Sequence, residues 1–147
     1  TNCEKANGAN SRNQFAGHIV GLREGDVDFE VRLKLDDENE IVAVITRDSA
    51  ETMGLTIGME ITALVKSSSV LLLNDRTVRT TARNHLWGEI TRIHDGPVNA
   101  EVTLALSGGR SVCAVVTHDS VEKLGLAVGE QVCALFKASA VILCLYQ

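Results

Sequence analysis

Much of the chain alternates between apolar and polar residues with the two-residue period of a half-buried β-strand. Residues 27–35 show this clearly, because every second position is Val, Phe or Leu and the positions between them are charged. Residues 59–65 alternate in the same way, and residues 41–45 form a continuous apolar run, which is typical of a buried strand. With a first strand after Arg12 and a last one at residues 70–73, the pattern predicts five short strands.

One short segment carries helical signals instead. Asp48 or Ser49 can cap the start of a helix, and Glu51 lies three residues after Asp48, as in a capping box. Gly54 can end the same helix, because glycine readily adopts the left-handed conformation found there. The acidic stretch 36–40 is a predicted loop.

The whole pattern occurs twice. A shift of 71 residues superposes residues 11–73 on residues 82–144 without a gap, and 25 of these 63 positions are identical. The chain therefore divides into a polar tail (1–9), a first module (10–73), a linker (74–80) and a second module (81–147). We expect a mainly β fold of two tandem OB-like five-stranded antiparallel β-barrel modules, each with one short helix.

Composition narrows the class of protein. The 147 residues are 45% hydrophobic and only 3% aromatic, and they carry a formal net charge of −5. A negative charge argues against a general nucleic-acid surface, which needs clustered Lys and Arg. The sequence shows neither a signal-peptide pattern nor the run of about 18–20 apolar residues that crosses a membrane, so we expect a cytoplasmic protein. The four cysteines form no Cys-x-x-Cys pair and are expected to be reduced thiols.

The sequence contains no recognisable catalytic constellation. Each histidine stands opposite a different residue type in the other copy, and none has a partner at metal-ligand spacing. Glu30 and Glu101 do repeat, but they lie on the polar face of a predicted strand, where an ion pair is expected. We therefore expect neither an enzyme nor a metal centre.

Hydrogen-bond donors do repeat. They are Arg12 and Arg83 ahead of the first strand, Thr46, Ser49, Thr117 and Ser120 at the start of the helix, and Lys66 and Lys137 at the end of a strand. A tetrahedral dianion only accepts hydrogen bonds, so guanidinium, ammonium, hydroxyl and amide groups are what it requires. A helix start adds free N–H groups and a favourable dipole. The alternative is that the hydroxyls only cap the helix and the cations are solvated.

Several short sequence stretches of the two copies form a combination that is typical of one known module. They are Ser11-Arg12-Asn13, Thr81-Ala82-Arg83-Asn84, the Thr-x-x-Ser…Gly-Leu-x-x-Gly segments, the Lys-Ser and Lys-Ala strand ends, and Gly-Pro-Val-Asn-Ala-Glu-Val-Thr-Leu at 96–104. In combination they resemble the molybdate-binding Mop (TOBE-type) module. The resemblance covers residues 10–144, and two modules in tandem are similar to a di-Mop protein.

This resemblance implies an OB-like barrel, molybdate or tungstate as the bound ligand, no redox or organic cofactor, and a homo-oligomer with oxyanion sites between modules of different subunits. Carried over position by position, the implied ligand residues are Asn10, Ser11, Arg12, Thr46, Ser49, Lys66 and Ser67 in the first module and Thr81, Arg83, Thr117, Ser120, Lys137 and Ala138 in the second. Asn10 stands where the family usually has Ser, and Ser67 where Ala is more usual.

Two roles follow from the resemblance. The chain resembles either the ligand-sensing domain of a molybdate-dependent transcription regulator or a free-standing molbindin for intracellular molybdate storage and homeostasis. Neither role requires a membrane or a direct nucleic-acid contact from this segment. The alternatives are an OB-fold nucleic-acid binder, which would need stacking aromatics and a basic groove, and a purely structural oligomerisation module.

Overall fold

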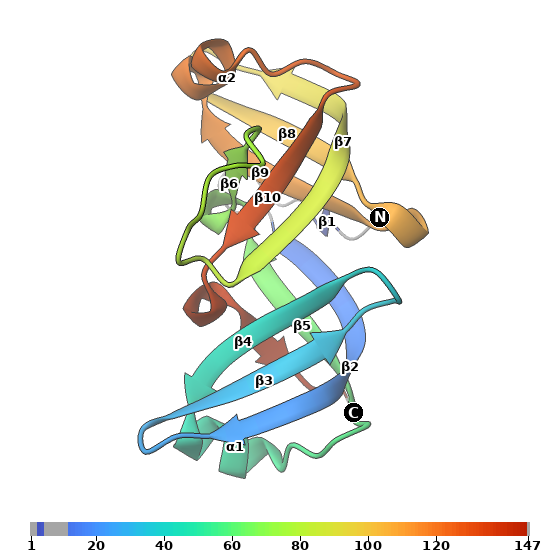
Figure 1. Cartoon of the computed structure of the whole chain (residues 1–147), viewed down its shortest axis with the longest axis vertical. Coiled ribbons are helices and arrows are strands. Elements are labelled where there is room, and N and C mark those ends of the chain that lie inside the picture. The colour runs from blue at the N-terminus through green and yellow to red at the C-terminus, as the bar shows by residue number, and fades with distance from the viewer. Residues whose placement is uncertain (1–2, 5–11, 147) are drawn as a thin grey trace.

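The computed structural model describes residues 3–4 and 12–146 and consists mainly of antiparallel strands (Figure 1). The first module contains β2 (Arg12–Glu24), β3 (Asp28–Lys34), β4 (Glu40–Thr46), α1 (Arg47–Met53), β5 (Glu60–Lys66), the 3-10 turn η2 (Ser67–Ser69) and β6 (Leu71–Leu73). The second contains β7 (Asn84–Asp95), β8 (Asn99–Ala105), the turn η3 (Ser107–Gly109), β9 (Ser111–Thr117), α2 (His118–Leu124), β10 (Gln131–Phe136), the turn η4 (Ala138–Ala140) and β11 (Ile142–Cys144). The two-residue strand β1 (Cys3–Glu4) pairs with β2.

The predicted strand patterns are confirmed, and the packing explains them. In β3, Val31 and Leu33 are fully buried while Arg32 between them is exposed. The continuous apolar run lies in β4, where Ile41 and Ala43 face the core. The turn η4 of the other module packs against β4. Because β4 has neighbours on more than its core face, apolar residues suit both sides of this strand.

Each module gives its last strand to the sheet of the other. The two strand orders are β11-β5-β2-β3-β4 and β6-β10-β7-β8-β9. Thus β11 pairs with β5 of the first module, and β6 pairs with β10 of the second, both antiparallel. The sequence pattern located these two strands, but it contains no signal for the sheet that each one joins.

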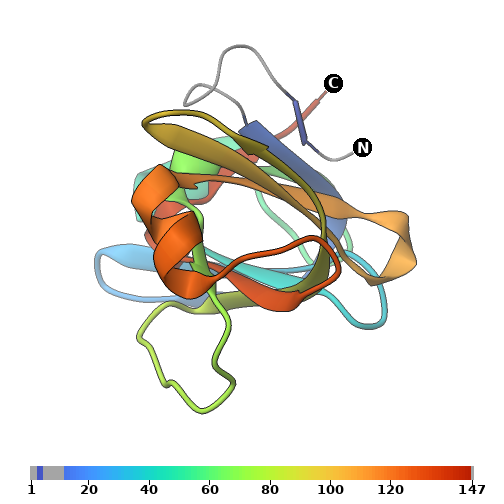
Figure 2. The same cartoon turned by 90° about the horizontal axis from the view of Figure 1, so that it is seen from above.

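The exchanged strands help each sheet to close into a barrel. β6 approaches β9, and β11 approaches β4, so the two edges of each sheet curl toward each other. Figure 2 shows these curved strands from above, with the yellow-green linker extending to one side. The enclosed side chains form one hydrophobic cluster with members from both modules, among them Phe15 and Phe136. The expected pair of OB-like barrels is therefore present, with a shared core.

Two buried asparagines join the modules. Asn13 Nδ2 donates to the carbonyl of Cys113 at 2.9 Å, and Asn13 Oδ1 accepts from the Cys113 N–H at 2.8 Å. Asn84 makes the same two bonds with Val42, at 2.8 and 2.7 Å. Cys113 and Val42 belong to β9 and β4, the edge strands of the two sheets. Each amide therefore pairs with an edge strand much as a neighbouring strand would.

The short helices begin earlier than predicted. Thr46 is the N-cap of α1, with an extended backbone and a side-chain oxygen that accepts from the N–H of Ser49. The expectation that Asp48 or Ser49 is the cap is therefore wrong, because both residues lie inside the helix. Gly54 ends α1 with φ 64°, as expected, and α2 repeats the arrangement. Across the described residues, no helix is long and apolar enough to span a membrane.

The cysteines differ in their chemical state. Cys133 and Cys144 are free thiols, and burial raises the pKa of Cys133. Cys113 is disulfide-bonded, so the expectation of reduced thiols is wrong for this residue. Spacing along the chain could not reveal the bond, because it depends on how the segments come together in space.

Candidate functional site

The strand-end donors of the first module meet where β2 begins and β5 ends. Arg12 and Lys66 are directly opposed in the antiparallel ladder, and both are exposed. Opposed residues place their side chains on the same face of a sheet with Cβ atoms about 4.5–5.5 Å apart, so two positive charges share this face. The next residue, Ser67, is fully buried, and within the described structure its Oγ has no hydrogen-bond partner. Such a group costs about 1–3 kcal/mol unless a partner reaches it.

The second module has a similar but not identical strand end. Asn84, the first residue of β7, pairs with Phe136, the last residue of β10. Arg83 immediately precedes Asn84, and Lys137 immediately follows Phe136. Ala138 then takes the place of Ser67 and is buried, so the second strand end lacks the hydroxyl.

Glu30 connects the second strand end to the first module. Arg83 Nη1 donates to Glu30 Oε1 at 2.8 Å, and Arg23 on the neighbouring strand lies 3.6 Å from the same oxygen. The hydrogen bond from Arg83 lowers the pKa of Glu30, against a smaller opposing effect of burial. The ion pair expected at Glu30 is therefore present, and one of its cations is a predicted anion ligand.

The helix-start hydroxyls form pairs. Thr46 Oγ1 donates to Ser49 Oγ at 2.9 Å and accepts from the Ser49 N–H at 3.1 Å, which leaves the Ser49 hydroxyl hydrogen to donate outward. Thr117 and Ser120 repeat the pair at 2.8 and 3.1 Å. The N–H of Arg47 already donates to a backbone carbonyl at 3.2 Å. In each helix the first and third N–H groups therefore already have acceptors, and the hydroxyl pair keeps one hydrogen that can be donated outward.

Within one chain, the two sets of donors lie far apart. Figure 1 shows α2 and α1 at opposite ends of the molecule, whereas the end of β10 and the turn η4 lie at mid-height, where the modules meet. The structure thus brings Arg12, Lys66 and Ser67 together, but not with Thr46 and Ser49. Of the remaining predicted residues, Thr81 is exposed in the linker region. Asn10 and Ser11 lie outside the described residues.

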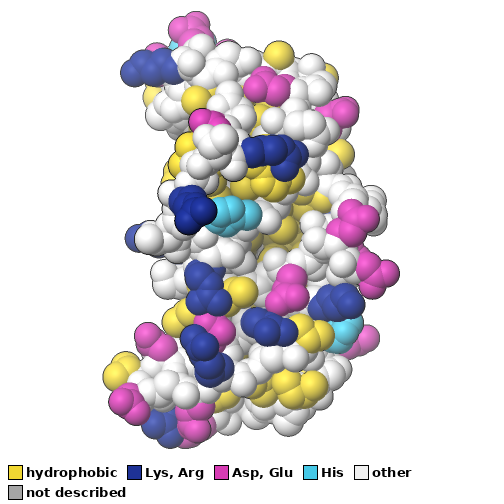
Figure 3. All heavy atoms as spheres, viewed as in Figure 1, with side chains coloured by type: hydrophobic (Ala, Val, Ile, Leu, Met, Phe, Trp, Pro, Cys, Tyr) yellow, Lys and Arg dark blue, Asp and Glu magenta, His cyan; other side chains and the backbone are white. Residues whose placement is uncertain are grey.

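Charges on the surface are mixed rather than segregated. Figure 3 shows Lys and Arg side chains interspersed with Asp and Glu on the face it displays. Arg32 and Glu40, for example, form an ion pair at 3.0 Å. In the described part of the chain, no group of three or more His, Cys, Asp or Glu side chains is placed to hold a metal ion. This face does not present a continuous basic groove of the kind that binds nucleic acid.

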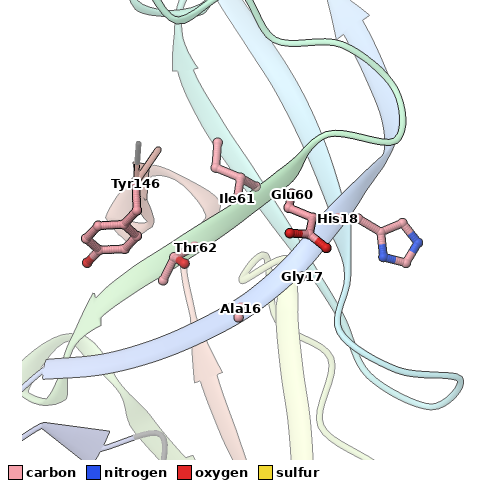
Figure 4. Close-up of a pocket in the computed structure, with 7 residues that line it drawn as sticks. All are labelled: Ala16, Gly17, His18, Glu60, Ile61, Thr62 and Tyr146. Atoms are coloured by element: carbon pink, nitrogen blue, oxygen red, sulfur yellow. The ribbon is translucent and has the colours of Figure 1, made fainter.

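A hollow of about 350 Å³ opens beside β2 and β5, with Tyr146 at its rim (Figure 4). Ala16 and Thr62 contribute to its floor, and His18 points away to one side (Figure 4). The predicted anion donors are not among the residues that line it. In the second module Trp87 stands at the position of Ala16, and the guanidinium of Arg76 lies 3.8 Å above its ring.

The sequence analysis missed the role of the two asparagines. Both are at most 1% exposed and bond to the other module, directly after the arginines predicted as ligands. The signal was present, since Arg12-Asn13 and Arg83-Asn84 are identical in the two copies. A buried asparagine that bonds to an edge strand orients the start of its own strand, and with it the preceding arginine.

Comparison with known proteins gives a family match over most of the chain. The model of the TOBE domain matches twice, at residues 9–72 and 80–143. These two matches correspond to the two sequence repeats.

Several curated proteins are similar over nearly the whole chain. The molybdenum transport protein ModE of Azotobacter vinelandii is 62% identical over 136 residues, which are 92% of this chain and 50% of that protein. The molybdenum-pterin-binding protein MopA of Rhodobacter capsulatus is 44% identical over 134 residues, 90% of this chain and 51% of that protein. The DNA-binding transcriptional dual regulator ModE of Escherichia coli K12 is 34% identical over 134 residues, 90% of this chain and 50% of that protein. The chain spans about half the length of these relatives.

A solved structure has the same fold. The cytoplasmic molybdate-binding protein ModG, crystallised with molybdate bound, is 43% identical and superposes with a TM-score of 0.88. The match covers 91% of this chain and 96% of the ModG chain.

Proposed function

Because this chain belongs to the TOBE domain family, we propose that it binds molybdate or tungstate as a tetrahedral oxyanion. One observation carries the proposal: the Ser67 hydroxyl is fully buried and has no partner among the described residues, and it lies next to Lys66 at the strand end that Arg12 shares. An oxyanion here would accept a hydrogen bond from the hydroxyl and face two positive charges. The similarity to ModG, which holds molybdate, supports the choice of anion.

The full set of predicted donors requires more than one copy of the chain. Strand ends and helix starts lie far apart in a single chain (Figure 1), so a site that uses both sets takes them from two subunits. Large exposed apolar residues next to both sets support such contacts. Val27 and Val98 are 74% and 71% exposed beside the helix starts, and Leu71 and Ile142 are 60% and 56% exposed beyond the strand-end turns. We therefore propose a homo-oligomer with oxyanion sites between subunits.

The same chemistry serves the two biological roles that the sequence predicts. Similarity to half of ModE supports a sensing domain of a molybdate-dependent regulator, and similarity to nearly all of ModG supports a molbindin that stores the anion. Both roles rest on binding rather than catalysis. We propose a cytoplasmic location for either role, as described for ModG.

Calorimetric titration with sodium molybdate tests the proposal. Lys66→Gln removes a charged donor and should weaken binding at its site about ten- to a hundredfold, since such a bond contributes about 1.5–3 kcal/mol. Lys137→Gln should do the same at the second strand end. Lys34→Gln is the matched control, because Lys34 lies on β3 and pairs with Asp37 at 3.5 Å. If both Lys66→Gln and Lys137→Gln bind molybdate like the parent, the assignment of these two lysines as anion ligands is contradicted.

Ser67→Ala separates binding from stability. The change removes a buried hydroxyl that has no partner in the part of the chain that the structure describes, so the melting temperature without anion should stay the same or rise. The affinity for molybdate should fall, and the rise in melting temperature on adding molybdate should shrink. A loss of stability without anion and an unchanged affinity would show that the hydroxyl has a structural role instead.

A further inference from the structure

The junction between the modules is symmetric in most of its contacts. Asn13 bonds to Cys113, and Asn84 bonds to Val42, which are pairs related by the 71-residue repeat. The turn η2 packs on β9 as η4 packs on β4, and β6 and β11 are exchanged reciprocally. Contacts of this kind could form equally well between two first modules or two second modules. By themselves they do not select the partner with which a module exchanges its strand.

One pair of loops in this junction is not symmetric. The acidic loop (residues 36–39) of the first module contacts the arginine loop (residues 107–110) of the second, and these loops occupy the same place in the repeat. Arg110 Nε donates to Asp36 Oδ2 at 3.1 Å, and Arg110 Nη2 donates to the carbonyl of Leu35 at 2.6 Å. Asn39 Nδ2 donates to Ser107 Oγ at 3.1 Å. Opposite charges therefore meet where equivalent loops of the two modules approach each other.

The backbone of the arginine loop adds a steric match. Gly108 has φ +76°, which favours glycine, and a Cβ at this position would lie 2.7 Å from Asp36 Oδ2. The carboxylate thus occupies space that is open only because residue 108 lacks a side chain. In the first module the corresponding residue is Asp37, whose side chain is 98% exposed.

We propose that these two loops select the pairing of modules, so that a first module exchanges strands with a second module and not with another first module. Two first modules would bring two acidic loops together at the same place. Two second modules would bring Arg110 opposite Ser107, the counterpart of Asp36, so the guanidinium would lose its carboxylate partner. Acidic loops brought close together repel each other, and a guanidinium without its carboxylate loses the ion pair; both effects are strongest where water is partly excluded. The side chains of Asp36 and Arg110 are 27% and 21% exposed, so solvent screens them only in part.

The hydrogen bonds at Asp36 agree with this role. Burial would raise the pKa of its carboxyl, but bonds from Asn39, the Glu38 N–H and Arg110 together hold the pKa below its ordinary value. The carboxylate is therefore charged and positioned for Arg110 at neutral pH.

Charge reversal in two separate chains tests the proposal. Asp36→Arg gives a chain with an arginine at both positions of the ion pair, and Arg110→Asp gives a chain with an aspartate at both. Each chain alone should melt about 5–10 °C below the parent. When the two are unfolded and refolded together, each module can pair with a complementary loop of the other chain. The co-refolded proteins should form a one-to-one complex, which can be isolated through a tag on one chain. Its melting temperature should recover at least half of the decrease seen in the separate variants.

Three comparisons complete the test. Mixing the two variants after each has folded should give no gain, because strand exchange requires unfolding. The double variant Asp36→Arg/Arg110→Asp should recover stability within a single chain. Asp36→Asn keeps an oxygen that can accept from the N–H groups of Glu38 and Asn39 but removes the charge. It therefore distinguishes the contribution of the turn hydrogen bonds from that of the ion pair. If Asp36→Arg is insoluble alone, its recovery only upon refolding with Arg110→Asp supports the proposal. A co-refolded mixture that melts like the separate variants, or fails to recover them, would overturn it.

Discussion

The two modules share one backbone plan but differ in what surrounds it. Even the irregularity in the long first strand repeats, since the register shifts after Ile19 in β2 and after Ile90 in β7. The differences lie in loops and in surface side chains. Trp87 in the second module is covered by Arg76, whereas Ala16 at the same position leaves an open hollow (Figure 4). The comparison indicates that duplication kept the core and the strand-exchange contacts, while the peripheral contacts diverged.

The symmetric part of the junction should be the most sensitive to mutation. Asn13→Ala and Asn84→Ala each leave an edge-strand N–H and carbonyl without their partner in a buried place, so each should lower the free energy of unfolding by about 2–4 kcal/mol. Asn13 also bonds to the carbonyl of Val65 at 3.3 Å, so its loss should be the larger. Urea denaturation measures both. Asn74→Ala is the control, because Asn74 is exposed and should contribute less.

The asymmetric loops can be compared through two adjacent glycines. Gly108 and Gly109 have φ +76° and +78°, so an alanine at either position is strained by about 1–2 kcal/mol. Only at Gly108 would the new Cβ also meet Asp36. We expect a loss of about 2–3 kcal/mol for Gly108→Ala and about 1–2 kcal/mol for Gly109→Ala. An equal loss of unfolding free energy in both variants would mean that the Asp36 side chain moves away from the new Cβ without an energetic penalty.

The peripheral contact of the second module should contribute less. Arg76→Ala removes the cation above Trp87, at a cost of about 0.5–1 kcal/mol for an exposed cation–π pair. Because Trp87 is the single tryptophan of the chain, its fluorescence should shift to longer wavelength as the ring becomes hydrated. Arg79→Ala is the neighbouring control in the same linker. An unchanged emission spectrum in Arg76→Ala would argue against the stacking.

The smallest effect is expected from the titration of one histidine in the second module. His118 bonds to Asp95 at 2.7 Å and lies 3.1 Å from Glu122, and the bond to Asp95 is the main reason that its pKa is raised above 6.5. Its stabilising effect is therefore complete below pH 6.5 and is lost as pH rises through the raised pKa. The matching residue, Arg47, pairs with Glu24 at 2.8 Å and stays charged. His118→Arg should make the melting temperature less dependent on pH over this range, and an unchanged dependence would contradict the assignment.

The sequence was a good guide to elements and a poorer guide to their ends. Alternation predicted β3 because Val31 and Leu33 face the core while Arg32 does not. It placed the cap of α1 at Asp48 or Ser49 because both are favourable capping types, whereas the structure uses Thr46. Local preference could not decide among neighbouring hydroxyl and carboxylate residues, since the end of β4 determines which one has an extended backbone.

For the candidate site, the sequence supplied the donor types and their repetition. The buried state of Ser67 could not be predicted, because it depends on how η2 packs against β9 of the other module. The ion pair of Arg83 with Glu30 likewise joins two modules. The burial of Ser67 and the ion pair of Arg83 are therefore properties of the junction, whereas Arg12 and Lys66 meet within the first module.

The sequence by itself determined the two repeats, their strands, the end of the short helix and the donors that recur, because each of these follows from local periodicity or from comparing one half of the chain with the other. Only the tertiary structure decided that β6 and β11 change places, that Asn13 reaches a carbonyl 100 residues away, and that Asp36 meets Arg110. The physical reason is that an apolar three-residue strand, a buried amide or a loop charge gains stability only from its partner. Where two modules are built from one pattern, the local sequence is compatible with either partner, and packing between distant segments makes the choice.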